Sequence, residues 1–156
     1  MIFTFPNIPP YLINMKIALI GCVKKKVSYK TKAESLYDST LFKYSLQYAK
    51  QEANKVFILS AKYGLLALDT FIEPYEVTLN TFLEQQKIEW SNRVFKQIKK
   101  EIGLDNQFIY LCGSNYKQYL IDRIPGSDPL KGLGLGKRIQ WLKNNIKKSY
   151  NIFEDI

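Results

Sequence analysis

Three short apolar runs alternate with amphipathic segments along the chain. The runs cover residues 16–22, 55–61 and 107–112, and each has the length and continuous hydrophobicity of a buried strand. Between them, apolar residues recur at helical spacing over 40–52 and 82–102. Strands that alternate with helices in this way predict a parallel sheet joined by right-handed crossovers. We therefore expect an α/β fold, a single three-layer domain with a mainly parallel sheet.

Capping and breaking residues set the expected boundaries of these elements. Ser39 and Thr81 are suited to cap the two long helices, and Gly103 is suited to end the second. Pro74 keeps residues 71–79 extended, because proline lacks the N–H group that a helix interior needs. The other expected elements are a loop over 23–35, a turn over 62–68, a short helix over 115–123 and a last helix over 137–148.

The length of the chain fits one domain. With 156 residues, of which 46% are hydrophobic, the chain can bury a sizeable core. We expect the domain to cover residues 15–150, after an N-terminal extension over 1–14 and before a short tail over 151–156. The extension is a poor signal peptide, because it lacks a basic region and contains three prolines. No run of about 18 apolar residues is present, so we expect no membrane partner and a cytoplasmic location.

The charge balance and the missing histidines narrow the chemistry. Lys and Arg number 23 against 14 Asp and Glu, a net charge of +9, which favours a nucleotide or nucleic acid as partner. A basic surface that only aids solubility is the alternative. The chain has no histidine and two cysteines, which excludes a Ser-His-Asp triad, a Cys-His dyad and the usual zinc sites. We expect neither a metal nor a cofactor.

All three predicted strands end in small residues. The end pairs are Gly21-Cys22, Ser60-Ala61 and Cys112-Gly113. If the strands are parallel, these ends share the edge of the sheet at which open α/β folds bind ligands. Small residues let a ligand approach the backbone there, although tight turns alone can also require them.

A basic loop follows the first strand. Lys24, Lys25 and Lys26 are followed by two more lysines before the first acid, Glu34. Such a loop attracts phosphate, and a desolvated lysine can act as nucleophile or base. Neighbouring ammonium groups would also favour the thiolate of Cys22. A solvated loop beside a buried structural cysteine is the alternative.

Polar and aromatic residues cluster after the second strand. Ser60, Lys62 and Tyr63 lie directly at its end, and Glu73 and Tyr75 follow. These side chains could supply acid–base groups or stack on a base. Glu73 is the expected general base, because no histidine exists to do that work. The alternative is that the tyrosines pack at the edge of the core.

A glycine-rich segment precedes the last predicted helix. Lys131, Gly132 and Gly134 belong to the sequence KGLGLGKR, which is suited to hold an anion at the start of the helix. It is not a Walker A loop, because Arg138 follows Lys137 where that motif has Ser or Thr. A flexible turn is the alternative.

Taken in order, these motifs resemble a small family of phage and bacterial domains. The shared pattern is Cys-x-Lys-Lys-Lys, Leu-Tyr-x-Ser-x-Leu-Phe, Leu-Ser-Ala-Lys-Tyr-Gly-Leu-Leu, Glu-Pro-Tyr and Pro-Leu-x-Gly-Leu-Gly. Here it lies at 22–26, 36–42, 59–66, 73–75 and 129–134. The resemblance adds Tyr37 and Ser39 to the candidate ligand-binding residues.

Two more distant resemblances point to nucleobases. Residues 59–75 resemble a segment of YaaA-type peroxide-stress proteins, a family linked to DNA binding. Residues 22–29 resemble the Cys-x3-Lys-Pro-Tyr motif of archaeosine synthase, which acts on a deazaguanine base in tRNA. The proline of that motif and its later histidine are missing here. Both relatives imply a connection with nucleobases or nucleic acid, and neither fixes a reaction.

We therefore expect an enzyme that acts on a nucleotide, nucleoside or nucleic-acid base by group transfer or N-glycosidic cleavage. The alternative is a non-enzymatic module that captures a nucleotide or nucleic acid, such as a phage-type sponge. The expected catalytic residues are Cys22, Lys26, Ser60, Lys62, Tyr63 and Glu73. The expected ligand-binding residues are Lys24, Lys25, Tyr37, Ser39, Tyr75, Gly113, Lys131, Gly132 and Gly134. The oligomeric state stays open.

Overall fold

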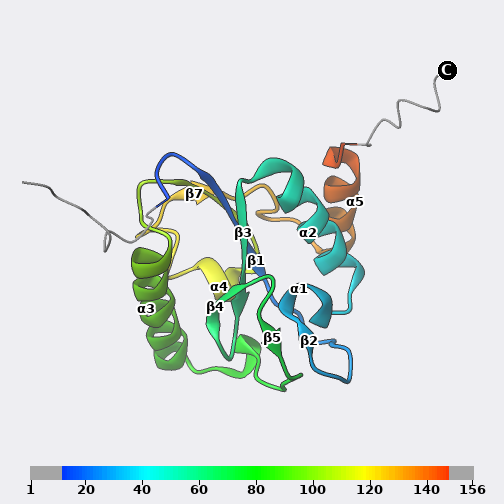
Figure 1. The fold of residues 1–156 in the computed structure, drawn as a ribbon, viewed down its shortest axis with the longest axis horizontal. Helices are drawn as coiled ribbons and strands as arrows, with labels where there is room; N and C mark the ends of the chain where they lie inside the picture. Colours follow the sequence, from blue (N-terminus) through cyan, green and yellow to red (C-terminus); the bar gives the residue numbers. More distant parts are fainter. Residues whose placement is uncertain (1–11, 148–156) are drawn as a thin grey trace, which may run out of the picture.

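A five-stranded sheet lies between two layers of helices in the computed structural model, which describes residues 12–147 (Figure 1). The central strand β1 (Lys16–Gly21) pairs in parallel with β3 (Lys55–Ser60) and with β6 (Gln107–Leu111). Two short strands extend the sheet: β4 (Gly64–Ala67) lies antiparallel to β3, and β7 (Gly126–Ser127) lies parallel to β6. The predicted three-layer α/β domain with a mainly parallel sheet is confirmed.

The long helices cover both faces of this sheet. Helices α2 (Thr40–Glu52) and α5 (Leu135–Asn145) pack on one face, and α3 (Glu84–Glu101) packs on the other (Figure 1). The shorter elements are β2 (Thr31–Lys32), α1 (Ala33–Leu36), β5 (Phe71–Ile72), the 3₁₀ helix η1 (Leu79–Thr81) and α4 (Ser114–Lys117). Strands β2 and β5 form a separate antiparallel pair.

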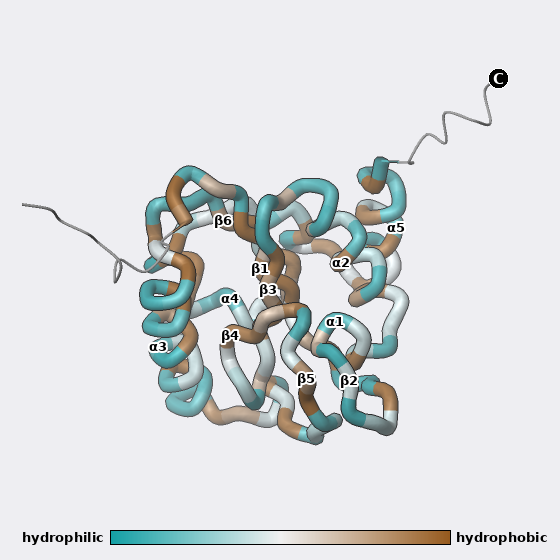
Figure 2. Tube along the Cα trace, viewed as in Figure 1, coloured by the Kyte–Doolittle hydropathy of each residue, from teal (hydrophilic) through white to brown (hydrophobic). Residues whose placement is uncertain are grey.

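The apolar residues of the central strand alternate between the two faces. Ile17 and Leu19 belong to the core beneath α3, while Ala18 and Ile20 belong to the core beneath α2. All four are at most 1% exposed, as expected of a strand that is covered on both sides. Figure 2 shows this hydrophobic centre between the more hydrophilic outer surfaces of the helices.

The crossover connections on the two sides of β1 run in opposite directions across the sheet. The connection through α2 leads to β3 on one side of β1, and the connection through α3 leads to β6 on the other side. Because these two helices lie on opposite faces, the carboxyl ends of β1 and β6 border a topological switch point, where open α/β sheets bind ligands. The prediction that the three apolar strands end at one edge is confirmed.

Some predicted boundaries are correct and others are wrong. Ser39 caps α2, with the Phe42 N–H group 3.1 Å from its Oγ. Thr81 does not cap α3 but ends η1; the helix begins after Leu83, whose N–H group donates to the side chain of Gln86 at 2.8 Å. The Gln86 side chain thus accepts the N–H group of the N-cap residue itself, and the side chain of Leu83 caps no N–H group of the first turn.

The loops contain more regular structure than the sequence predicts. Residues 62–68, expected as a turn, form a hairpin in which Gly64 (φ 72°) begins β4. Residues 23–35, expected as a loop, include β2 and most of α1. The predicted helix over 115–123 is only the short α4, and α5 begins at Leu135 rather than at 137.

The ends of the chain lie largely outside the described residues. Leu12 and Asn14 donate backbone hydrogen bonds to the carbonyls of Ile102 (3.1 Å) and Asp105 (2.8 Å), beyond the end of α3. Most of the predicted extension over 1–14 and all of the tail over 151–156 are outside the described range, so these boundaries stay predictions. Among residues 12–147, no helix combines the length and the apolar character needed to cross a membrane.

Candidate functional site

Cys22 lies where the central strand ends. Its N–H group donates to the carbonyl of Leu59 at 3.0 Å, which continues the β1–β3 pairing by one residue. The half-buried thiol lies 3.1 Å from the hydroxyl of Tyr116 in α4. The Tyr116 ring packs edge-on against Trp90 of α3, with the ring centroids 5.5 Å apart. Cys22 thus lies where the hydrophobic cores on the two faces of the sheet meet, and it packs against both.

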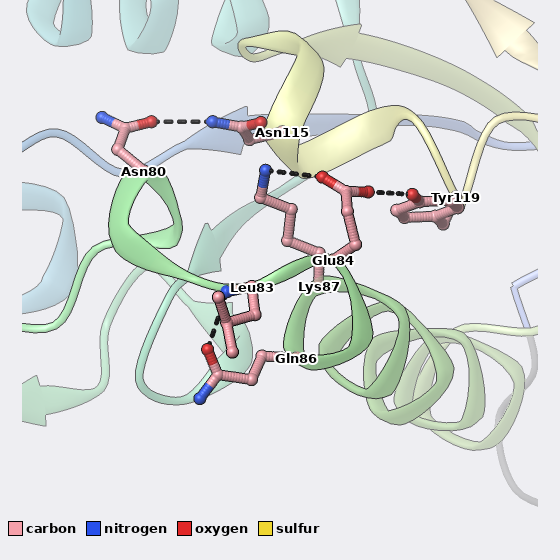
Figure 3. Close-up of polar contacts among 7 residues, drawn as sticks. All are labelled: Asn80, Leu83, Glu84, Gln86, Lys87, Asn115 and Tyr119. Carbon is pink, nitrogen blue, oxygen red and sulfur yellow. Dashed lines mark hydrogen bonds and ion pairs between the residues drawn. The ribbon is translucent and has the colours of Figure 1, made fainter.

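The α4 turn is tied to the start of α3 by polar contacts (Figure 3). The hydroxyl of Tyr119 donates to the carboxylate of Glu84, and the side-chain amide of Asn115 donates to Asn80 at 2.8 Å. Asn80 belongs to η1 and Glu84 is the first residue of α3. The two contacts therefore join the α4 segment, which contains Tyr116, to η1 and to the start of α3.

Three buried hydroxyls form a chain beside this thiol. Ser60 Oγ lies 2.7 Å from the Tyr75 hydroxyl, which lies 2.5 Å from the Tyr37 hydroxyl. Ser60 Oγ already accepts the N–H groups of Lys62 (3.2 Å) and Tyr63 (3.0 Å), so it must donate its own hydrogen to Tyr75. The two phenols share one further hydrogen bond, which uses only one of their two hydrogens. One phenolic O–H group is left without an acceptor among the described residues.

Lys26 reaches back over these rings. Its Nζ lies 4.4 Å from the centroid of the Tyr75 ring and 5.7 Å from that of Tyr37, and it donates to the Lys24 carbonyl at 3.0 Å. Desolvation lowers the pKa of Lys26 from its ordinary value, and the nearby Cys22 thiol only partly opposes this shift. The amine form of Lys26 is therefore reached at a lower pH than in a solvated lysine.

Burial also governs the titration of the other groups at this edge. It raises the pKa values of Tyr37, Tyr75 and Tyr116 well above their usual range, so these phenols stay neutral hydrogen-bond donors. Burial also raises the pKa of the Cys112 thiol to about 12. Cys112 is therefore a structural thiol, and Cys22 is the accessible cysteine of the site.

A small cavity of about 50 Å³ lies between the ends of β1 and β6. Gly21, Cys22, Gly113 and Arg138 are among the residues that line it. The glycine at position 21 is required by packing, since a Cβ there would lie 2.8 Å from the Cβ of Cys112. The small residues at the strand ends thus serve close packing and leave space at the switch point.

Comparison with known protein families gives one match. A family model described as "Family of unknown function (DUF6884)" matches residues 17–144. The chain belongs to this family. The match spans the sheet and both Cys22 and Arg138. Searches of curated proteins and of solved structures gave no match to this DUF6884 chain.

The DUF6884 fold brings most of the predicted site residues together. Tyr63 packs edge-on against Tyr75, with the ring centroids 5.6 Å apart, and Lys62 Nζ lies 5.3 Å from the Tyr63 ring centroid. The predicted residues gathered at this edge are Cys22, Lys26, Tyr37, Ser60, Lys62, Tyr63, Tyr75 and Gly113. We call Lys26, Tyr37, Ser60, Tyr63 and Tyr75 the tyrosine–lysine cluster. Their catalytic and binding roles stay predictions.

Other predicted residues lie apart from this cluster or serve the fold. Glu73 is exposed and forms no hydrogen bond or ion pair with any residue of the range 12–147, and the carboxylate that acts on Lys26 is that of Glu76. Lys24 and Lys25 are exposed, and Lys25 lies 3.7 Å from Asp38. Ser39 has the structural role of capping α2.

The glycine-rich segment leads into α5 as predicted. Gly132 has a positive φ of 76°, and Gly134 is the N-cap residue of α5. Lys131 is exposed to solvent. Within the described residues, no group of three or more His, Cys, Asp or Glu side chains is arranged to hold a metal ion.

Sequence reasoning missed two residues of the site. Tyr116 follows the third strand end by only a few residues, and that position is the signal that could have pointed to it. Arg138 was considered only as a break in the Walker A pattern, yet it lies in the first turn of α5 and lines the cavity. A cation directly after a glycine-rich helix start was the available signal.

Proposed function

We propose that the protein is an enzyme that acts on a nucleotide, a nucleoside or a nucleic-acid base by group transfer or N-glycosidic cleavage. Cys22 and Lys26 are its reactive groups. The observation that carries this proposal is the position of Lys26, whose ammonium is desolvated over the Tyr75 ring beside the Cys22 thiol.

A lysine that only holds phosphate has no need of this environment. Lys24, two residues away, is exposed to solvent, which suits a strongly hydrated ammonium group. Lys26 is instead drawn against aromatic rings, and desolvation makes its amine form more accessible. An amine with an available lone pair can attack an electrophilic carbon or take a proton, which favours an enzyme over a simple binder.

The surroundings of Lys26 suit a flat heterocycle that carries hydrogen-bond acceptors. The half-buried ring of Tyr63, which packs edge-on against Tyr75, supplies apolar contact area. The buried Tyr37–Tyr75 pair has one phenolic O–H group without an acceptor among the described residues, and a ring nitrogen or carbonyl is a suitable acceptor for it. Donation by a buried, neutral phenol is strong, because no water competes for it. The resemblance to YaaA-type proteins and archaeosine synthase supports the same class of ligand.

The proposed roles follow from these contacts. Lys26 in its amine form acts as nucleophile or base, and the Tyr37–Tyr75 pair donates a hydrogen bond to the base. Tyr116 orients the Cys22 thiol through their 3.1 Å contact. The general-base role expected of Glu73 from the sequence follows from none of these contacts and stays a prediction.

Mass spectrometry of substrate pools tests the proposal. The purified protein is incubated with nucleosides, nucleotides and short oligonucleotides, and the products are separated by liquid chromatography. A component whose mass changes only in the presence of protein supports an enzyme. A nucleotide that stays bound and unchanged would contradict the enzyme and identify a binding module.

A further inference from the structure

We infer that the cavity between the ends of β1 and β6 is an anion subsite, in which Arg138 binds a phosphate group of the substrate. The inference rests on the proposed function and narrows its substrate class to nucleotides, as opposed to free bases or nucleosides. Three features of the cavity carry it: the state of Arg138, the size of the space and the position of Cys22.

The Arg138 side chain is held in place by one hydrogen bond, but no carboxylate of the described residues pairs with its charge. Its Nε–H group donates to the carbonyl of Leu133 at 2.7 Å, which fixes the side chain on the first turn of α5. A guanidinium carries five N–H groups, and the other four have no hydrogen-bond partner among the described residues. No carboxylate of residues 12–147 forms an ion pair with Arg138. A half-buried arginine in this state is suited to a bidentate anion.

The cavity contains no competing negative side chain. Of the described residues that line it, Arg138 is the only Lys, Arg, Asp or Glu, and the others are apolar residues, glycines, two cysteines and one serine. Ser45 is the one hydroxyl residue among them, and it is buried. An anion that enters this space therefore meets one cation and no carboxylate.

The size of the cavity selects a compact group. Its volume of about 50 Å³ exceeds the roughly 10–15 Å³ that a cavity needs to hold one water molecule. It is far below the ~300 Å³ at which pockets for whole drug-sized ligands begin. A phosphate group fits this scale and a nucleobase does not. The base must lie outside the cavity, at the tyrosine–lysine cluster.

Cys22 connects the two places. It lines the cavity and also packs against the core that contains Tyr37 and Tyr75 of the tyrosine–lysine cluster. We therefore expect a nucleotide with its phosphate beside Arg138 to carry its sugar past Cys22 toward the cluster.

Alkylation of Cys22 reports directly on this subsite. Cys112 is 4% exposed and its pKa is raised to about 12 by burial, so iodoacetamide modifies Cys22 selectively. Inorganic phosphate is titrated at constant ionic strength, with chloride as the balancing salt, and the rate of modification is followed by intact mass. We expect phosphate to slow the reaction saturably, by occupying the cavity and by opposing formation of the thiolate.

Two variants of neighbouring residues provide the decisive comparison. Arg138→Gln should weaken this protection by phosphate at least tenfold, whereas Lys137→Gln, an exposed cation on the same helix turn, should leave it unchanged. Arg138→Lys keeps the charge, loses the bidentate geometry and should show an intermediate effect. Thermal melts show which variants are folded. Absence of protection in the parent protein, or equal protection in Arg138→Gln and Lys137→Gln, would overturn the subsite.

The experiments can contradict the anion subsite and the proposed enzyme activity independently of each other. Phosphate protection through Arg138, without conversion of any substrate pool, would support the subsite and contradict only the enzyme. Conversion of uncharged nucleosides as fast as nucleotides, unaffected by Arg138→Gln, would contradict only the subsite.

Discussion

The Lys26 side chain lies over the ring of Tyr75, with its Nζ 4.4 Å from the ring centroid. This contact joins the loop after β1 to the segment after β5. The cation–π attraction, of order 0.5–2 kcal/mol, favours the charged form of the amine. Desolvation by burial acts in the opposite direction and lowers the pKa of Lys26, against the influence of the nearby Cys22 and Glu76. The site thus holds a lysine whose charged form is destabilised.

This shift predicts a distinct pH profile for Lys26. Its acetylation by a low concentration of acetic anhydride, followed by peptide mass spectrometry, should show a midpoint below the ordinary value of 10.5. In urea the midpoint should return to that value, because unfolding restores solvent around Lys26. The same midpoint in the folded protein and in urea would contradict the desolvated environment.

The same shift has a consequence for stability. Between the lowered pKa of folded Lys26 and its ordinary value of 10.5, the unfolded state binds more protons than the folded state. The free energy of unfolding, measured relative to Lys26→Met, should therefore rise with pH across this window.

The chain of hydroxyls predicts a specific loss of stability. Tyr75→Phe removes the shared partner of Ser60 and Tyr37 and leaves two buried hydroxyls with fewer hydrogen bonds, at a cost of about 1–3 kcal/mol. Tyr63→Phe is the control, because the Tyr63 hydroxyl has no hydrogen bond to a described residue, and it should change stability by less than about 0.5 kcal/mol. Urea denaturation gives both values. Equal effects of the two substitutions would argue against the network.

Much of this fold follows from patterns that are local in sequence. The apolar runs at Lys16–Gly21 and Lys55–Ser60 are continuous because both faces of the sheet are covered, and the small residues after them mark the ligand edge. Ser39 caps α2 by an interaction that spans only three residues, so the sequence shows it directly. The prediction for Thr81 was wrong because η1 ends there and α3 begins only at Glu84, where the Gln86 side chain accepts the N–H group of Leu83.

The site itself depends on contacts between distant segments. Cys22 meets Tyr116 only because β6 crosses to the far side of β1, and sequence spacing carries no trace of that pairing. The sequence likewise does not predict that Lys26, out of five closely spaced lysines, lies over a tyrosine ring. Lys26 differs from Lys24 and Lys25 only in its position in the folded loop.

A buried ion pair next to the cavity region predicts a large effect on folding. Lys117 Nζ lies 2.6 Å from Asp128 Oδ2, and the two side chains are 11% and 10% exposed. Lys117→Met leaves a buried carboxylate unpaired, and such losses cost about 3–5 kcal/mol. Lys25→Met, at the solvent-exposed Asp38 pair, should have little effect because water and salt screen it. Chemical denaturation of both variants checks this, and similar small losses would show that the Lys117 pair is not desolvated.

The roles of Glu76 and Glu73 can be distinguished by substitution. Glu76 influences Lys26, so Glu76→Gln removes a charge that favours the ammonium and should move the acetylation midpoint of Lys26 to lower pH. Glu73→Gln should leave that midpoint in place. If Glu73 is the general base, its substitution abolishes turnover without lowering the melting temperature. A variant that only melts earlier would make Glu73 a structural residue.

Turnover by Lys26→Met, compared with Lys24→Met, tests the central claim most directly. Both substitutions remove one lysine charge from the same loop, but only Lys26 lies over the Tyr75 ring. With the substrate identified by mass spectrometry, we predict that Lys24→Met converts it at nearly the parent rate. Lys26→Met should be slower by about 100-fold or more, the usual contribution of a positioned acid–base group. Equal rates for the two variants would contradict the assignment of Lys26 as a reactive group.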